Sequence, residues 1–529
     1  MPDVRSGPAV SAALRDLAYA AGFFLCYMVA DLSTRGSARL READGSAPLL
    51  VLASLRANWP VVAVVVLIAV GLIVRSPARF GAGWSAIEHG SQLRFVVAPL
   101  LALLVWQGSL YQYNYLLDRA HLVDRFLIVA LAAAALWRPA FLVPFALQYR
   151  IVAAQFGFPF GTTAAQNIDE LLVVMLLAVA GAHLMFVLIG RADSSPVFLV
   201  MAAALATHFF IPGRGKLFLG WFRHEDLTNL AGNGYVIGWL GQTDGGFSRW
   251  LADVVALFNG PLLAATLLLE LGAVLVVSHH RLFRLWLPVA AVFHVINFLL
   301  LGFWFLEWIV VEMVLFVLLS RADLRPWLDR NLRTARVALA VVAVGLAGSV
   351  LFHPPGLAWY DTPLVYGYEL EVTTVGGATY NLPVEAFAPF SQELAFSRLQ
   401  LGPTHPLTGA WGVVATADDL AMVQGLGDLD EVAAAETPVG SELDQHHVRV
   451  EDFLESFVAN ANRRANGDHR FADFLAVVAP LPKYWLGRPQ PTYDFQEPIE
   501  RLEIHRVTDL RVDADHHRRR TLVMTIDAR

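Results

Sequence analysis

Long apolar runs separated by short polar connections fill the first two thirds of the chain. A helix that crosses the hydrocarbon core of a bilayer needs about 20 consecutive, mostly apolar residues. The runs therefore predict an all-α polytopic membrane bundle of about 9–11 spans, at residues 12–30, 57–74, 94–110, 121–137, 139–155, 168–190, 196–211, 252–277, 285–301, 303–319 and 337–352. Residues 211–250 form the longest polar interruption between these runs, and we expect a loop there.

Beyond the last apolar run the pattern changes to short alternating segments. Residues 367–387 alternate and contain a Val-Gly-Gly turn signal, which predicts a β-hairpin. Residues 499–513 and 520–527 also alternate like strands, whereas residues 450–465 have helical spacing. The acidic stretch 417–445 is interpreted as a loop or an ordered excursion.

Composition supports two domains, a transmembrane domain at 1–352 and a soluble, mainly β extracytoplasmic domain at 353–529. The chain of 529 residues is 56% hydrophobic and only 16% charged, whereas soluble domains carry about 25% charged residues. The first domain holds 25 basic and 20 acidic side chains, a balance of +5, and the second holds 14 and 26, a balance of −12. An acidic domain suits nucleic acid poorly, so no nucleic-acid partner is expected. Cys26 is the only cysteine, which excludes an intramolecular disulfide.

Arginine-rich segments predict the orientation in the membrane, because cytoplasmic connections carry an excess of Lys and Arg. Residues 321–336 contain five arginines, and residues 279–284 are also basic. We expect both segments inside, which puts the N-terminus inside and the C-terminal domain outside. The chain is therefore expected to be a multi-pass protein of the bacterial cytoplasmic (inner) membrane, surrounded by membrane lipids.

One lysine is conspicuous because the chain has only two, Lys216 and Lys483. Lys216 stands in FFIPGRGKLFLGW, close to Arg214, at the start of the expected loop. Arginine keeps its proton in proteins, whereas a partly buried lysine beside a like charge loses its proton more readily. A neutral amine is a usable general base. The alternative is a lysine that extends to the lipid headgroups.

Two segments resemble the HTTM (horizontally transferred transmembrane) domain family, which includes the vitamin K-dependent γ-glutamyl carboxylases. Residues 209–227, FFIPGRGKLFLGWFRHEDL, resemble the family's pattern of an aromatic pair, a glycine, Lys-Leu and a following tryptophan. Residues 292–305, VFHVINFLLLGFWF, resemble its segment with Phe-His, Asn and Gly-Phe. The resemblance extends over roughly residues 90–320.

The resemblance implies a quinol-dependent membrane enzyme, a vitamin K-dependent γ-carboxylase-like lyase or oxygenase. Lys216 falls on the lysine that acts as the base toward vitamin K hydroquinone, and His294 falls on the histidine of the second segment. The implied cofactor is a reduced quinone, such as vitamin K hydroquinone or menaquinol, and the implied substrate is a peptide or protein on the outer side. Neighbouring candidates for binding substrate or cofactor are Arg214, Trp221, Asn297 and His208.

The sequence departs from the carboxylases at a further catalytic histidine, which they carry upstream in a Trp-Asn-Asn-His-Ser-Tyr type segment. The corresponding stretch here, WQGSLYQYNYLLDRAH at residues 106–121, has Tyr113 and Asn114 in that region. These two residues are additional candidates for binding the cofactor. The missing histidine leaves two reactions open, quinol oxidation with the addition of CO2 or without it.

Each polar candidate also has a purely structural interpretation. His208, His294 and Asn297 can hydrogen-bond neighbouring helices, and carboxylates within the apolar runs, such as Glu270 and Glu312, are costly unless paired or protonated. The RHED sequence at 223–226 lacks the spacing of metal ligands, and no metal is expected. Two other functions stay open: a membrane partner or assembly protein that docks a periplasmic protein, and a transporter. The transporter is less favoured because no pair of interrupted helices marks matching halves.

Overall fold

The computed structural model describes most of both predicted domains. The described residues are 12–34, scattered positions from 56 to 74, 76–110, 122–155, 164–190, 192–224, 227–239, 246–277, 279–331, 352, 354, 356–388, 391–396, 401–439, 442–467, 478–481, 484, 491–512 and 515–528. Most of the run at 57–74, the whole of 337–350 and the candidates Tyr113 and Asn114 lie outside these residues.

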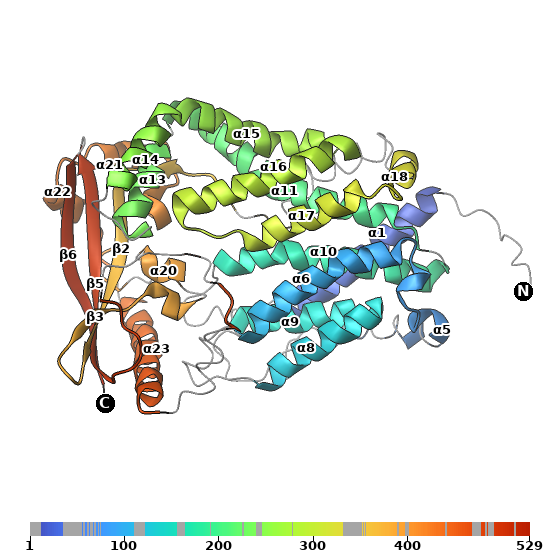
Figure 1. Cartoon of the computed structure of the whole chain (residues 1–529), viewed down its shortest axis with the longest axis horizontal. Coiled ribbons are helices and arrows are strands. Elements are labelled where there is room, and N and C mark those ends of the chain that lie inside the picture. The colour runs from blue at the N-terminus through green and yellow to red at the C-terminus, as the bar shows by residue number, and fades with distance from the viewer. Residues whose placement is uncertain are drawn as a thin grey trace, which may run out of the picture.

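A bundle of long helices makes up the described part of the first domain (Figure 1). Five of them are long and apolar enough to cross a membrane: Gly90–Leu110, Asp169–Ile189, Ser195–Leu219, Asn259–Val276 and His280–Leu301. The long helices are α1 (Ala12–Thr34), α6 (Gly90–Leu110), α8 (Leu122–Trp137), α9 (Leu142–Gln155), α10 (Ala164–Ile189), α11 (Ser195–Leu219), α15 (Asn259–Val276), α16 (His280–Leu301) and α17 (Leu306–Ser320). The prediction of a helical domain is thus confirmed, and its apolar helices are compatible with a multi-pass membrane protein.

Two expectations about helix boundaries are wrong. The run at 252–277 is divided at Phe258 into α14 (Gly246–Leu257) and α15, because Pro261 has no N–H to donate and is tolerated only in a first helical turn. The expected loop at 211–250 is largely helical, since α11 continues to Leu219 and is followed by the short helices α12 (Trp221–His224) and α13 (Leu227–Val236).

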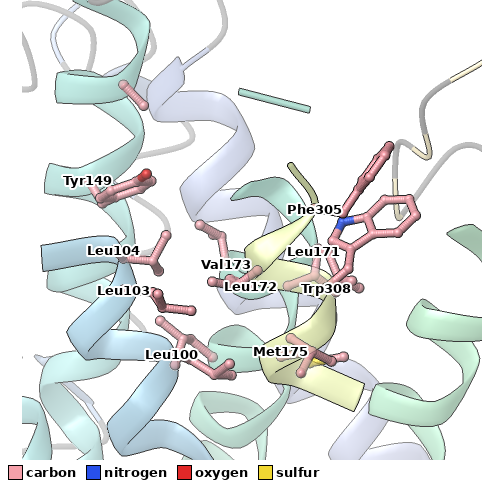
Figure 2. Close-up of a cluster of buried hydrophobic side chains, with 14 of the residues drawn as sticks. Leu100, Leu103, Leu104, Tyr149, Leu171, Leu172, Val173, Met175, Phe305 and Trp308 are labelled. Carbon is pink, nitrogen blue, oxygen red and sulfur yellow. The ribbon is translucent and has the colours of Figure 1, made fainter. Parts of the chain in front are cut away.

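The centre of the bundle is an apolar cluster between α6, α9, α10 and the start of α17. Figure 2 shows Phe305 and Trp308 of this last segment beside the leucines of α10. Its labelled side chains are Leu100, Leu103, Leu104, Tyr149, Leu171, Leu172, Val173, Met175, Phe305 and Trp308. α10 and α11 are mostly buried, whereas only 22% of α15 and 28% of α16 are buried, so these two helices form the periphery.

The C-terminal domain contains a four-stranded antiparallel sheet of order β3-β2-β5-β6. Its strands are β2 (Leu364–Thr374), β3 (Thr379–Asn381), β5 (Ile499–Val512) and β6 (Asp515–Asp527), and a separate pair is formed by β1 (Tyr360–Asp361) and β4 (Val413–Val414). β2 and β3 confirm the predicted hairpin, whose turn uses Gly377 at φ +79°. β5 and β6 confirm the other two predicted strands.

The C-terminal domain contains more helix than its alternating sequence pattern predicts. The predicted helix at 450–465 is confirmed within the longer α23 (Glu442–Ala465). The acidic stretch 417–445, expected as a loop or an ordered excursion, is ordered and contains α21 (Ala417–Gln424) and α22 (Leu429–Ala435), which begin at the N-caps Thr416 and Asp428. Acidic residues in the first turn of each helix face the positive end of its dipole, so their charge favours helix rather than loop.

The sheet stands at one end of the bundle, and the short helix α18 (Arg325–Asn331) lies at the opposite end (Figure 1). His280 Nε2 lies 3.2 Å from Asp329 Oδ1, and Arg281 lies 3.4 Å from the same carboxylate. The described parts of the two arginine-rich segments predicted to be cytoplasmic, residues 279–284 and 321–331, therefore lie together at the end of the bundle away from the sheet.

Candidate functional site

Lys216 lies in the last turn of α11 rather than in a loop. The helix continues through Pro212-Gly-Arg-Gly, and its two glycines allow neighbouring residues to approach closely. A Cβ on Gly213 would lie 2.7 Å from Glu270 Cβ, and a Cβ on Gly215 would lie 2.7 Å from Ala358 Cβ. The helix ends at Gly220, whose φ of +71° is the left-handed conformation common at helix C-termini.

A carboxylate of α15 holds the Lys216 ammonium group. Nζ donates to Glu270 Oε1 at 2.5 Å, and both residues are buried. Nζ also lies 5.0 Å from the centroid of the Trp221 ring. The expected neighbour of Lys216 was the like charge of Arg214, so this opposite charge corrects the predicted environment. Arg214 is half-buried and makes no ion pair with any residue that the structure describes.

His294 is paired in the same way with a carboxylate of the next helix. Its Nδ1 lies 3.1 Å from Oε1 and 3.3 Å from Oε2 of Glu312 on α17, and both residues are buried. The imidazole contacts aromatic rings at centroid distances of 5.3 Å to Phe209, 5.0 Å to Phe305 and 5.0 Å to Trp308. His294 is also close enough to Glu270 to act on its charge.

The two segments that carry the resemblance, residues 209–227 and 292–305, therefore lie in contact. Phe209, in the first segment, touches His294, in the second. His208 turns differently: its Nδ1–H donates to the carbonyl of Ala204 at 2.8 Å, and its ring meets the edge of Trp308 at 5.5 Å. That geometry fits a packed histidine. Asn297 is half-buried, and the described residues give it no hydrogen-bond partner.

Several buried polar atoms around these pairs have no hydrogen-bond partner among the described residues. Among them are the indole nitrogens of Trp221 and Trp308 and the Oε2 atom of Glu270. A buried polar group without a partner costs about 1–3 kcal/mol. Such atoms are few in native proteins, and each calls for an explanation such as a bound molecule.

A second buried polar group lies between α6, α9, α10 and α17. Gln107 donates to Glu307, and the hydroxyl group of Tyr149 donates to Asp169 Oδ2 at 2.6 Å. All four side chains are buried. Sequence reasoning singled out the carboxylates Glu270 and Glu312, but it did not predict that they pair with Lys216 and His294, and it did not predict this second group. The only available signal was the cost of a carboxylate inside an apolar run.

The C-terminal domain covers the end of the bundle where Lys216 lies. Tyr360 OH donates to the carbonyl of Leu219 at 2.6 Å. Asn233 of α13 donates to the carbonyls of Thr362 and Trp411 at 2.9 and 2.8 Å. Any Cβ on the following Gly412 would lie 2.3 Å from the Asn233 amide nitrogen, so this junction requires glycine. These contacts fix the domain directly above α11 and α13.

Other candidate sites are weaker. An apolar hollow of about 30 Å³ beside Phe198 and His280 lies near the opposite end of α11 from Lys216, and small-molecule sites enclose about 300–1,000 Å³. Among the described residues no three His, Cys, Asp or Glu side chains gather as metal ligands. Burial raises the pKa of Tyr235 on α13 to about 12, so its hydroxyl group stays neutral at physiological pH.

The site is thus built from α11, α15, α16 and α17, with Trp221 beside it and Tyr113 and Asn114 outside the described residues. Lys216 and His294 lie on neighbouring helices, each paired with a carboxylate and each beside aromatic side chains. Comparison of the chain with protein-family models, curated proteins and solved structures finds no match.

Proposed function

We propose that this chain is an integral membrane enzyme of the HTTM type that binds a lipophilic reduced quinone and uses Lys216 as its base. The observation that carries the proposal is the presence of two buried couples on neighbouring helices, Lys216 with Glu270 and His294 with Glu312, the second of them beside the Phe209 ring. Buried ionisable groups gathered in an apolar site are typical of proton-transfer chemistry.

The residues present fit a reduced quinone. Aromatic side chains line the site, and the indole N–H groups of Trp221 and Trp308 are donors that quinone oxygen atoms would satisfy. Trp221, Trp308 and Phe209 would hold the ring, and Lys216 would meet a hydroxyl group. When bound, a reduced quinone supplies an acidic hydroxyl group and reducing power toward O2.

The Lys216–Glu270 couple explains how a buried lysine can take up a proton. The 2.5 Å contact lets one proton be shared between Nζ and Oε1. With the proton on Glu270, Nζ carries a free electron pair for the proton of a ligand hydroxyl group. Glu270 then stabilises the ammonium ion that forms. Glu312 fixes the orientation of His294, and the aromatic rings exclude water.

Replacement of the lysine tests the proposal. Lys216→Met and Lys216→Arg are each expected to lower quinol-dependent O2 uptake or epoxide formation by about 10²–10⁴-fold, the usual contribution of a general base. Arg223→Met, which removes an exposed cation just beyond the same helix end, is the matched control and should retain turnover. Unchanged turnover in both lysine variants would refute the mechanism.

The orientation belongs to the same proposal. The C-terminal domain faces outside, the arginine-rich end faces the cytoplasm of a bacterial cell, and a peptide or protein substrate approaches from the outer side. A reporter enzyme that is active only outside the cytoplasm, fused after the C-terminal residue, should be active. An active cytoplasmic reporter at that position would reverse the assignment.

A further inference from the structure

The water-facing side of the Lys216 site is covered by the C-terminal domain. Ala358 lies so close to Gly215 that a Cβ there would be 2.7 Å away. Tyr360 is anchored two residues further along, on the carbonyl of Leu219. The end of α11 is therefore capped by protein where it faces the sheet.

The opposite side has a thinner cover. Trp221, Leu263 and Leu267 form a small buried cluster of their own, separate from the main apolar core. The leucines belong to α15, and the Trp221 ring stands 5.0 Å from Lys216 Nζ. The Trp221 ring thus contacts Lys216 and packs with leucines of the peripheral helix α15.

The surface outside this cluster is apolar. Phe218 at the end of α11 is 82% exposed and Leu268 of α15 is 76% exposed. Leu217 of α11 and Phe222 of α12 are also exposed. Large apolar side chains are also exposed elsewhere on α15 and along α16. Large apolar side chains on the periphery of a membrane bundle are solvated by lipid chains rather than by water.

A glycine separates Trp221 from the end of α11, so the Trp221 side chain can move while α11 stays in place. Gly220, at φ +71°, is the joint between α11 and the four-residue helix α12. Glycine adopts this region freely and leaves it freely. The indole N–H of Trp221 is buried without a hydrogen-bond partner among the described residues, so moving the ring breaks no such bond.

We infer that ligands reach Lys216 sideways from the bilayer, between α12 and α15, with Trp221 as the closing side chain. The ligand class that fits this route has a hydroxyl-bearing ring at the headgroup level and an apolar chain that remains in lipid. The displaced indole can then donate its N–H to an oxygen atom of the ligand. The identity of the ligand rests on the proposed function, but the route can be tested without turnover.

The scarcity of lysine makes the test direct. The full chain is reconstituted in phosphatidylcholine vesicles and treated with two amine-reactive succinimidyl esters, a hydrophobic one that partitions into the bilayer and a sulfonated one that stays in water. Mass spectrometry then measures the extent of modification at Lys216, with modification at Lys483 as the internal reference. Trp221→Ala should raise modification of Lys216 by the hydrophobic ester several-fold and leave modification by the sulfonated ester unchanged.

Three variants complete the design. Trp221→Phe keeps an aromatic cover and should behave like the wild type, as should Trp250→Ala, which removes an exposed tryptophan of α14. Tyr360→Phe loosens the water-side cap and should leave both rates unchanged. The buried Cys26 thiol must stay unreactive toward maleimide in every variant, which reports an intact bundle.

Two results would overturn the inference. One is faster modification by the sulfonated ester in Trp221→Ala or Tyr360→Phe, which would indicate a route from water. The other is an unchanged rate with the hydrophobic ester in Trp221→Ala. If quinol-dependent turnover survives in Lys216→Met while the labelling follows the expected pattern, the proposed chemistry fails and the route from the bilayer stands.

Discussion

Ion pairs occur in both halves of the molecule, but in opposite surroundings. In the bundle, the side chains of Lys216 and Glu270 are 10% and 5% exposed. On the sheet, Arg520 pairs with Glu369 while these side chains are 41% and 33% exposed. Water can replace a lost partner on the sheet and cannot do so inside an apolar bundle. The bundle therefore depends on its pairs being complete, whereas the sheet tolerates losing them.

The largest effect on stability is expected from breaking the buried pair at one end. Glu270→Ala leaves an uncompensated ammonium group and should cost about 3–5 kcal/mol. Thermal unfolding of the purified chain in detergent measures the loss. The double variant Lys216→Met, Glu270→Met removes both charges and should recover most of the stability while remaining inactive. A double variant as unstable as Glu270→Ala would show that packing, not charge, dominates there.

The second-largest effect on stability is expected at Gly213, where the absence of a side chain leaves room for Glu270. Gly213→Ala places a Cβ 2.7 Å from Glu270 Cβ and 3.2 Å from the backbone nitrogen of Leu271, and overpacking of this kind costs about 1–3 kcal/mol. Gly272→Ala on α15 is the matched control, because nothing lies within 4 Å of its Cβ. Alanine should stabilise the helix there by roughly 0.5–1 kcal/mol. Shifts of the unfolding temperature with the same sign in the two variants would contradict the claim that Gly213 is needed for close packing against Glu270.

The same glycine shows what the sequence could and could not predict. Apolar length predicted the helices, because a span must satisfy its backbone within itself. Pro-Gly-Arg-Gly before Lys216 has the composition of a turn, yet Gly213 and Gly215 serve close contacts with Glu270 and Ala358. A glycine that permits a turn and a glycine that permits close packing are identical in a single sequence.

The sequence predicted the two basic residues of the candidate site, but it did not predict which carboxylates pair with them. Rarity singled out Lys216, and the spacing of a known family singled out His294. Their carboxylate partners lie 54 and 18 residues away, and only the packing of α15 and α17 selects them. In the C-terminal domain, alternation predicted β2 and β5, but the short acidic helix α22 was hidden. Its signal was the N-cap Asp428.

A buried polar group of the C-terminal domain should respond only in alkaline solution. Burial raises the pKa of Tyr493 from its ordinary value of 10.0 to about 12, and its hydroxyl group donates to the carbonyl of Glu497 at 2.6 Å. The neutral form therefore contributes stability that is complete below pH 10 and is lost as the pH rises through about 12. Tyr493→Phe should flatten this loss in an alkaline titration followed by circular dichroism. Coincident alkaline profiles of the two proteins would contradict it.

The smallest effect is expected on the open sheet. Glu369 accepts hydrogen bonds from both Arg518 and Arg520, yet exposed pairs contribute only about 0–1 kcal/mol and are screened by salt. Glu369→Ala should therefore lower the unfolding temperature slightly at low salt and hardly at all at high salt. Glu369 has more cationic partners than Glu270, so the two substitutions separate partner number from burial. A loss at Glu369 as large as that at Glu270 would make partner number, rather than burial, the reason that the halves differ.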